Sequence, residues 1–121
     1  MYTVGRRRPR MAATLQELSA AVLAFRDERD WKQFHGPKDT AIGLMLEAAE
    51  VLELVQWKRD GDPVDRARLG EELADVLAWV LILAHDQGLD LAEELRRKLE
   101  KNARNYPVEK ARGVARKYTD L

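Results

Sequence analysis

Cysteine is missing from the 121-residue sequence, and a long apolar run is missing as well. Without a thiol the chain can form neither a disulfide framework nor a thiolate metal site, and an intracellular location is compatible with this. The longest apolar run, Val76 to Ala84, is less than half as long as a membrane helix. We therefore expect a soluble, cytoplasmic protein in which any metal ligand is Asp, Glu, His or backbone oxygen.

Most of the chain also lacks an excess of basic over acidic residues. The formal net charge is zero, but Arg6, Arg7, Arg8 and Arg10 all lie at the N-terminus. Without them 17 basic residues stand against 21 acidic ones, so the rest of the chain carries about −4 and is unlike a nucleic-acid-binding surface. The first residues lack the apolar stretch of a secretory signal. We interpret residues 1–12 as a basic, disordered tail.

Strand-like alternation of apolar and polar residues is absent too, and helical periodicity takes its place. Capping-box patterns at Thr14 and Asp90, each with Glu three residues later, predict two helix starts. Four helices are expected, over about residues 14–29, 40–58, 63–85 and 90–105. The predicted fold is all-α, with one domain over residues 13–107 and a C-terminal tail, 108–121, that is disordered or lies over a partner subunit.

Acidic residues interrupt two of these apolar helices in pairs. The stretch "LMLEAAEVLELVQW" carries Glu47 and Glu50, with Glu53 a further three residues on, and "EELADVLAW" carries Glu72 and Asp75. Residues three apart are neighbours on a helix surface. If the two helices pack with these pairs facing, four carboxylates meet at close range and repel one another unless cations are present.

Carboxylate oxygens are the ligands that Mg²⁺ and Mn²⁺ prefer. The pattern therefore predicts a Mg²⁺ or Mn²⁺ site formed by Glu47, Glu50, Glu72 and Asp75, with Glu53 either supporting a ligand or lying at the solvent edge. A di-iron bundle would need Glu-x-x-His, and no Glu has His three residues later. The remaining alternative is that the acids are the solvated faces of two surface helices, in a chain that is 35% charged.

Aromatic residues accompany the acids. Trp57 follows Glu50 by seven residues and Trp79 follows Glu72 by seven, which places each indole two helical turns from an acid on the same face. The loop "DWKQFHGPKD" adds Trp31 and Phe34, and His35 is either a donor to a base or phosphate or a turn residue. Because aromatic rings stack on nucleobases, these residues together favour a nucleotide pocket over a purely structural role.

These motifs resemble the all-α nucleotide pyrophosphohydrolases of the MazG-like superfamily, and within it the dCTP pyrophosphatase branch. The superfamily pattern of E-x-x-E and E-x-x-D on successive helices matches Glu47/Glu50 and Glu72/Asp75. The segments "FRDERDWKQFH", "EAAEVLELVQWK", "EELADVLAWV" and "KLEKNARNYP" are similar to that branch in the same order, from about Leu15 to Pro107.

The resemblance implies a four-helix bundle, assembled as a dimer or dimer of dimers, that hydrolyses a nucleoside triphosphate between the α and β phosphorus. The expected activity is Mg²⁺-dependent conversion of dCTP or modified dCTP to dCMP and pyrophosphate, which sanitises the nucleotide pool. Glu50 is expected to orient the attacking water. The expected substrate-binding residues are Trp31, Lys32, Gln33, Phe34, His35, Trp57 and Trp79, with Lys98 and Asn102 reaching the phosphates.

Two departures from the family bear on base choice. Val22 stands where some members place a histidine that contacts the base, and Trp79 replaces a position that is often Tyr. One alternative is therefore the same chemistry with dUTP or a broader set of triphosphates. A separate alternative is a non-catalytic helical oligomerisation module, in which the acids are surface residues. Nucleic-acid association through the arginine tail would instead give binding that falls steeply with salt.

Overall fold

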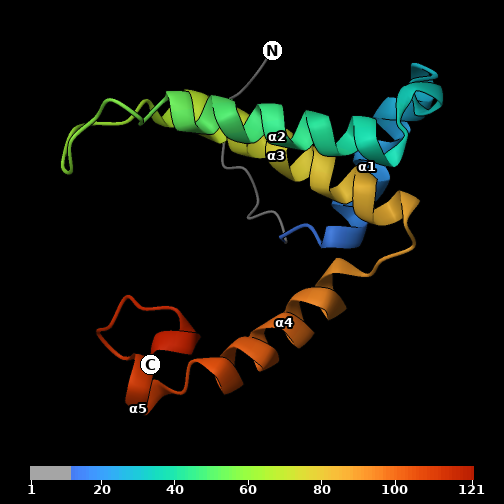
Figure 1. Cartoon of the computed structure of the whole chain (residues 1–121). Coiled ribbons are helices and arrows are strands. Elements are labelled where there is room, and N and C mark those ends of the chain that lie inside the picture. Colours follow the sequence, from blue (N-terminus) through green and yellow to red (C-terminus); the bar gives the residue numbers. More distant parts are fainter. Residues whose placement is uncertain (1–11) are drawn as a thin grey trace. The chain divides into compact units, whose positions relative to one another are not determined.

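A computed structural model describes residues 12–121, which form helices joined by turns (Figure 1). In chain order the elements are α1 (Leu15–Glu28), η1 (Lys32–Phe34), α2 (Pro37–Glu53), α3 (Arg66–Asp86), α4 (Leu91–Asn105), α5 (Val108–Ala111) and η2 (Tyr118–Asp120). No strand occurs among the described residues, so the all-α prediction is confirmed. The tail expected at residues 1–12 lies, apart from its last residue, outside them.

The chain divides into two units, which we describe separately. The first extends to Leu83 and holds α1, η1, α2 and most of α3, whereas the second, Ala84–Leu121, holds the end of α3 and everything after it. The division falls inside the range 13–107, so the single domain expected there stays a prediction. All four of the predicted metal ligands belong to the first unit.

The start of α1 shows the predicted capping box. The Thr14 hydroxyl accepts a hydrogen bond from the Glu17 N–H at 3.1 Å, and the Glu17 carboxylate accepts one from the Thr14 N–H at 3.4 Å. Two N–H groups that no helical carbonyl can reach are thereby satisfied.

The boundaries of α2 differ from the sequence expectation at both ends. The helix begins at Pro37, whose fixed φ suits a first helical position, and the buried Thr40 donates its hydroxyl to the Gly36 carbonyl at 2.7 Å. It ends at Glu53 instead of continuing to Lys58. After that point Leu54 and Val55 donate to carbonyls three residues back, which tightens the last turn and stops the α-helical pattern.

Helices α2 and α3 lie against each other in opposite directions (Figure 1). Gly43, early in α2, meets Trp79 late in α3, while Glu47 and Glu50 further along α2 meet Glu72, which is early in α3. The start of α3 is set by Asp65, whose carboxylate accepts from the Arg68 N–H at 3.1 Å. The helix therefore begins three residues after Pro63, which is the residue where the sequence analysis expected its start.

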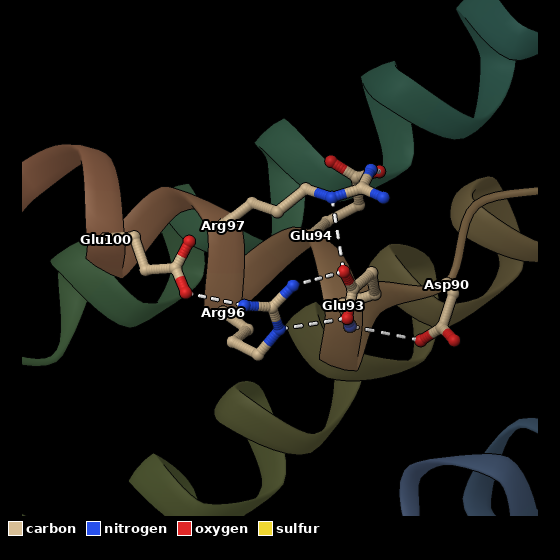
Figure 2. A network of polar contacts seen from close by, with 6 residues as sticks. All are labelled: Asp90, Glu93, Glu94, Arg96, Arg97 and Glu100. Atoms are coloured by element: carbon tan, nitrogen blue, oxygen red, sulfur yellow. Dashed lines mark hydrogen bonds and ion pairs between the residues drawn. The ribbon is translucent and has the colours of Figure 1, made fainter.

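In the second unit, α4 carries a series of local polar contacts. The Asp90 carboxylate accepts from the Glu93 N–H at 3.2 Å, and Arg96 bridges Glu93 and Glu100 along the helix surface (Figure 2). Exposed pairs of this spacing each stabilise a helix by about 0.2–0.5 kcal/mol.

The C-terminal segment, residues 108–121, contains α5 and η2. Tyr118 in η2 packs edge-on against Tyr106, with ring centroids 5.8 Å apart. This segment therefore has a defined local structure. Across the described part of the chain, no helix combines the length and the apolar character that crossing a bilayer requires.

The capping box predicts a measurable contribution to stability. Thr14→Ala should lower the free energy of unfolding by about 1 kcal/mol, because the Glu17 N–H loses its acceptor. Urea denaturation followed by circular dichroism measures this. Thr14→Ser keeps the hydroxyl and is the control; equal stability of the Ala and Ser variants would contradict the capping role.

Candidate active site

Three of the predicted acidic ligands converge between α2 and α3. Glu47, Glu50 and Glu72 each offer a carboxylate oxygen, and these oxygens lie within 4.8 Å of one another. Glu47 and Glu72 are half-buried and Glu50 is exposed. The charge of Asp75 acts on both Glu47 and Glu72, which places it beside the same group. We call these four residues the acidic cluster; that they bind a metal stays a prediction.

Hydrogen bonding, burial and neighbouring negative charge together raise the pKa of two carboxyl groups in the acidic cluster. A hydrogen bond with Glu50, burial, and the charges of Glu50, Asp75 and Glu47 raise the pKa of Glu72 to about 7. Burial also raises the pKa of Glu47, with further contributions from Glu50 and Asp75, while a hydrogen bond with Trp79 opposes the rise. In the absence of a cation, the cluster therefore relieves its repulsion by holding protons.

Two oxygen atoms of the acidic cluster have an environment that a divalent cation would fit. Glu47 Oε2 and Glu72 Oε2 are buried, and neither has a hydrogen-bond partner among the residues that the structure describes. Buried oxygen atoms are normally satisfied, and a cation bound between α2 and α3 would satisfy both. The donor set is all carboxylate, which suits Mg²⁺ or Mn²⁺ and not a softer metal.

Trp79 lies directly beside the acidic cluster. Its indole packs against the α2 backbone at Gly43 and makes an edge-to-face contact with the His35 ring, whose centroid lies 5.2 Å away. His35 is half-buried, and its Nδ1 has no hydrogen-bond partner within the described part of the chain. The structure therefore brings two predicted substrate-binding residues together with Glu47.

The rest of the ring-rich loop makes local contacts. Trp31 packs edge-on against Phe25 of α1 at 5.8 Å, and Gln33 donates to the Asp30 carbonyl and carboxylate at 2.9 and 3.0 Å. Lys32 and Phe34 are exposed in η1, Phe34 by 64%.

Trp57 does not occupy the position expected from helical periodicity. Because α2 ends at Glu53, the interval from Glu50 to Trp57 is not two helical turns, and Trp57 is 88% exposed in the turn that follows. The argument that placed it on the face of Glu50 is therefore wrong. Lys98 and Asn102 are one turn apart on α4, in the second unit.

An apolar cavity of about 280 Å³ lies between α1 and α3 in the first unit. It is lined by Ala21, Val22 and Phe25 from α1 and by Ala78, the neighbour of Trp79, from α3. Sequence reasoning connected only Val22 with the substrate, since apolar residues on an amphipathic helix carry no sign of a cavity. Gly43 was also missed, although a glycine inside a helix often signals close packing.

Comparisons with known proteins agree with this geometry. A family model described as the MazG-like family matches residues 42–121. The dCTP pyrophosphatases 1 of Bos taurus and Homo sapiens are each 41% identical to the chain, and the matched region covers 89% of this chain and 68% of each relative. A solved pyrophosphatase from Archaeoglobus fulgidus DSM 4304 superimposes with a TM-score of 0.73 at 34% identity, covering 84% of this chain and 99% of that one.

The chain belongs to the MazG-like family, in its dCTP pyrophosphatase branch. It is thus a hydrolase of the nucleoside triphosphate pyrophosphatase class, with the fold of the solved pyrophosphatase. Both the fold class and the family resemblance read from the sequence are confirmed.

The raised pKa of Glu72 predicts a pH dependence of stability without divalent ions. Below about pH 4.5 this carboxyl is protonated in the folded and the unfolded chain, so it contributes no slope. Between pH 4.5 and about 7 the unfolded chain has lost a proton that the folded chain retains, so the free energy of unfolding falls as pH rises.

Glu72→Gln should remove this fall. Urea denaturation in EDTA, repeated across that pH range, compares the variant with the wild type. The two stability curves should diverge with rising pH, the variant becoming relatively more stable. Parallel curves would contradict the assigned electrostatics.

Proposed function

We propose that the protein converts dCTP, or a modified dCTP, to dCMP and pyrophosphate in a Mg²⁺-dependent reaction, and so sanitises the nucleotide pool of the cytoplasm. The observation that carries the proposal is the convergence of Glu47, Glu50 and Glu72 in a chain whose relatives are dCTP pyrophosphatases.

The acidic cluster would hold the metal. Glu47 and Glu72 would contribute their unpartnered buried oxygens, and the exposed Glu50 and Asp75 would complete the set from the solvent side. When bound, a divalent cation neutralises the triphosphate and makes nearby water more acidic. The two helices already bring carboxylate oxygens of Glu47, Glu50 and Glu72 within 4.8 Å of one another.

Glu50 is the proposed residue for orienting the attacking water. It is exposed, unlike Glu47 and Glu72, so its carboxylate can accept a hydrogen bond from a water molecule that comes from solvent. Its proximity to both half-buried acids would keep that water beside the metal that they are proposed to hold. Pyrophosphate is a good leaving group once its charge is neutralised, so placement is the main demand on the protein.

The nucleobase would lie near the cavity between α1 and α3, with aromatic side chains at its edge. Trp31 and Phe34 are exposed rings available for stacking, and His35 has an unsatisfied nitrogen. Lys32, Gln33, Trp57 and Trp79 complete the proposed base and sugar contacts, and Lys98 and Asn102 are proposed to donate to the phosphates.

A second candidate has the same chemistry with a different base preference, such as dUTP or several triphosphates. The lining of the cavity supports it, because Ala21, Val22, Phe25 and Ala78 offer no polar side-chain atom to read the edge of a base. A value of kcat/KM measured for each of dCTP, dUTP, dTTP and dATP separates the two candidates.

The acidic cluster predicts where the reaction is sensitive to mutation. Glu50→Gln and Asp75→Asn should each lower kcat by about 100-fold or more, because each ~1.4 kcal/mol of lost transition-state stabilisation is tenfold in rate. Anion-exchange chromatography distinguishes dCMP plus pyrophosphate from dCDP plus phosphate, with Mg²⁺ and with EDTA.

Glu71→Gln is the matched control, since this exposed glutamate is next to Glu72 in α3 but outside the cluster. It should retain wild-type kcat. Activity in EDTA, or wild-type activity of Glu50→Gln and Asp75→Asn, would contradict the proposed site.

The enzyme is also proposed to assemble as a homodimer or homotetramer. Burial supports this: among the described residues the buried apolar side chains are Leu81, Ile82 and Ala84, a small core for this length. Large apolar side chains are exposed on α2 and α3, which monomers seldom tolerate in such number. They are Ile42, Met45, Leu46, Leu52, Leu73 and Leu77.

Assembly can be tested on Met45, which is 69% exposed in the single chain. Light scattering after size-exclusion chromatography should give two or four times the chain mass of 13.9 kDa. Met45→Glu should shift the mass downward by burying a charge at the interface, whereas Gln56→Glu, which adds the same charge in the exposed turn after α2, should not. A wild-type mass of one chain would contradict the proposed assembly.

A further inference from the structure

The closest approach between α2 and α3 that involves a glycine occurs at Gly43. A Cβ placed on this residue would lie 2.6, 2.7 and 2.8 Å from Cε2, Cζ2 and Cδ2 of Trp79. Real side chains do not approach so closely, so any residue other than glycine would displace the indole or separate the helices. All three atoms belong to the six-membered ring, which therefore lies directly on the α2 backbone.

Glycine at this position works against the helix itself. Residue 43 is inside α2, where glycine is less favourable than alanine because it loses more backbone freedom on folding. Gly70 of α3 shows the contrast, since a Cβ there would meet no atom within 4 Å. The local sequence therefore does not explain why residue 43 is glycine. The Trp79 ring that packs against it does.

The indole is also placed to act on the acidic cluster. Glu47 follows Gly43 by four residues, so both lie on one face of α2, and Trp79 follows Glu72 by seven on the facing helix. The Trp79 side chain lies close enough to the Glu47 carboxylate to lower its pKa, and its ring is held on another side by the edge-to-face contact with His35. Gly43, His35 and Glu47 thus surround one side chain.

We propose that Gly43 and Trp79 are a size-matched positioning pair: the missing side chain at residue 43 lets the indole lie on α2, where it fixes the orientation of the Glu47 carboxylate. The inference rests on the proposed metal site, whose geometry it refines. It gives Trp79 a role in holding a ligand residue, in addition to its proposed contact with the base or sugar. Neither residue touches the reacting atoms in this account.

Gly43→Ala is the most direct variant. A methyl group at residue 43 pushes the indole away, and Glu47 loses its support, so Mn²⁺ affinity should fall by about 10-fold to 100-fold, as when a metal ligand loses an orienting partner. Trp79→Phe keeps a ring but removes the N–H donor. Its Mn²⁺ affinity should also fall by about 10-fold to 100-fold. Isothermal titration of the metal-free protein with Mn²⁺ alone measures affinity without reference to catalysis.

Gly70→Ala is the matched control for the change from glycine to alanine in a helix. It should raise the melting temperature and leave Mn²⁺ affinity unchanged. The double variant Gly43→Ala/Trp79→Phe tests the pair directly, because the smaller phenyl ring leaves room for the methyl group. Its loss of affinity should be smaller than the product of the two single losses, as expected for residues in contact. Circular dichroism of each variant establishes that it folds.

The outcomes separate this inference from the proposed function. A wild type that binds Mn²⁺, together with weakened Gly43→Ala and a non-additive double variant, supports the pair. If the wild type binds Mn²⁺ but Gly43→Ala has the same affinity, or if the losses of affinity in the double variant simply multiply, the proposed pair is overturned. The proposed metal site is then unaffected. Absence of saturable Mn²⁺ binding by the folded wild type overturns both.

Discussion

Repulsion among the carboxylates on α2 and α3 is the constraint on which the rest of the structure depends. Antiparallel packing of the two helices brings Glu47, Glu50 and Glu72 within 4.8 Å, with Asp75 beside them. Such an arrangement costs free energy in an empty protein, and raised pKa values show how the chain tolerates it. A divalent cation would turn the same arrangement into a binding site. The repulsion among the carboxylates and the proposed metal binding therefore have one origin.

Other features of the first unit serve to hold this arrangement in place. Pro37 and Thr40 set the start of α2, Asp65 sets the start of α3, and Gly43 allows close contact at one end of the helix pair. His35 and Trp79 meet at that end, and the cavity between α1 and α3 is lined by Ala78, the neighbour of Trp79 in sequence.

Sequence patterns predicted the features that depend on local spacing. The three-residue intervals of Glu47/Glu50 and Glu72/Asp75 gave the acidic cluster, and Thr14 gave the start of α1. The failures came where tertiary contacts or the end of a helix decide the outcome. Trp57 was misplaced because no glycine or proline marks the end of α2, and Gly43 went unnoticed because its reason lies on another helix.

Anomalous diffraction from crystals grown with Mn²⁺ and a non-hydrolysable dCTP analogue tests the central claim most directly. The account predicts an anomalous peak between α2 and α3, within coordination distance, about 2.0–2.3 Å, of carboxylate oxygens from both helices, including Glu47 and Glu72. A peak held by one helix alone, or no peak at these residues while the analogue is bound, would contradict it.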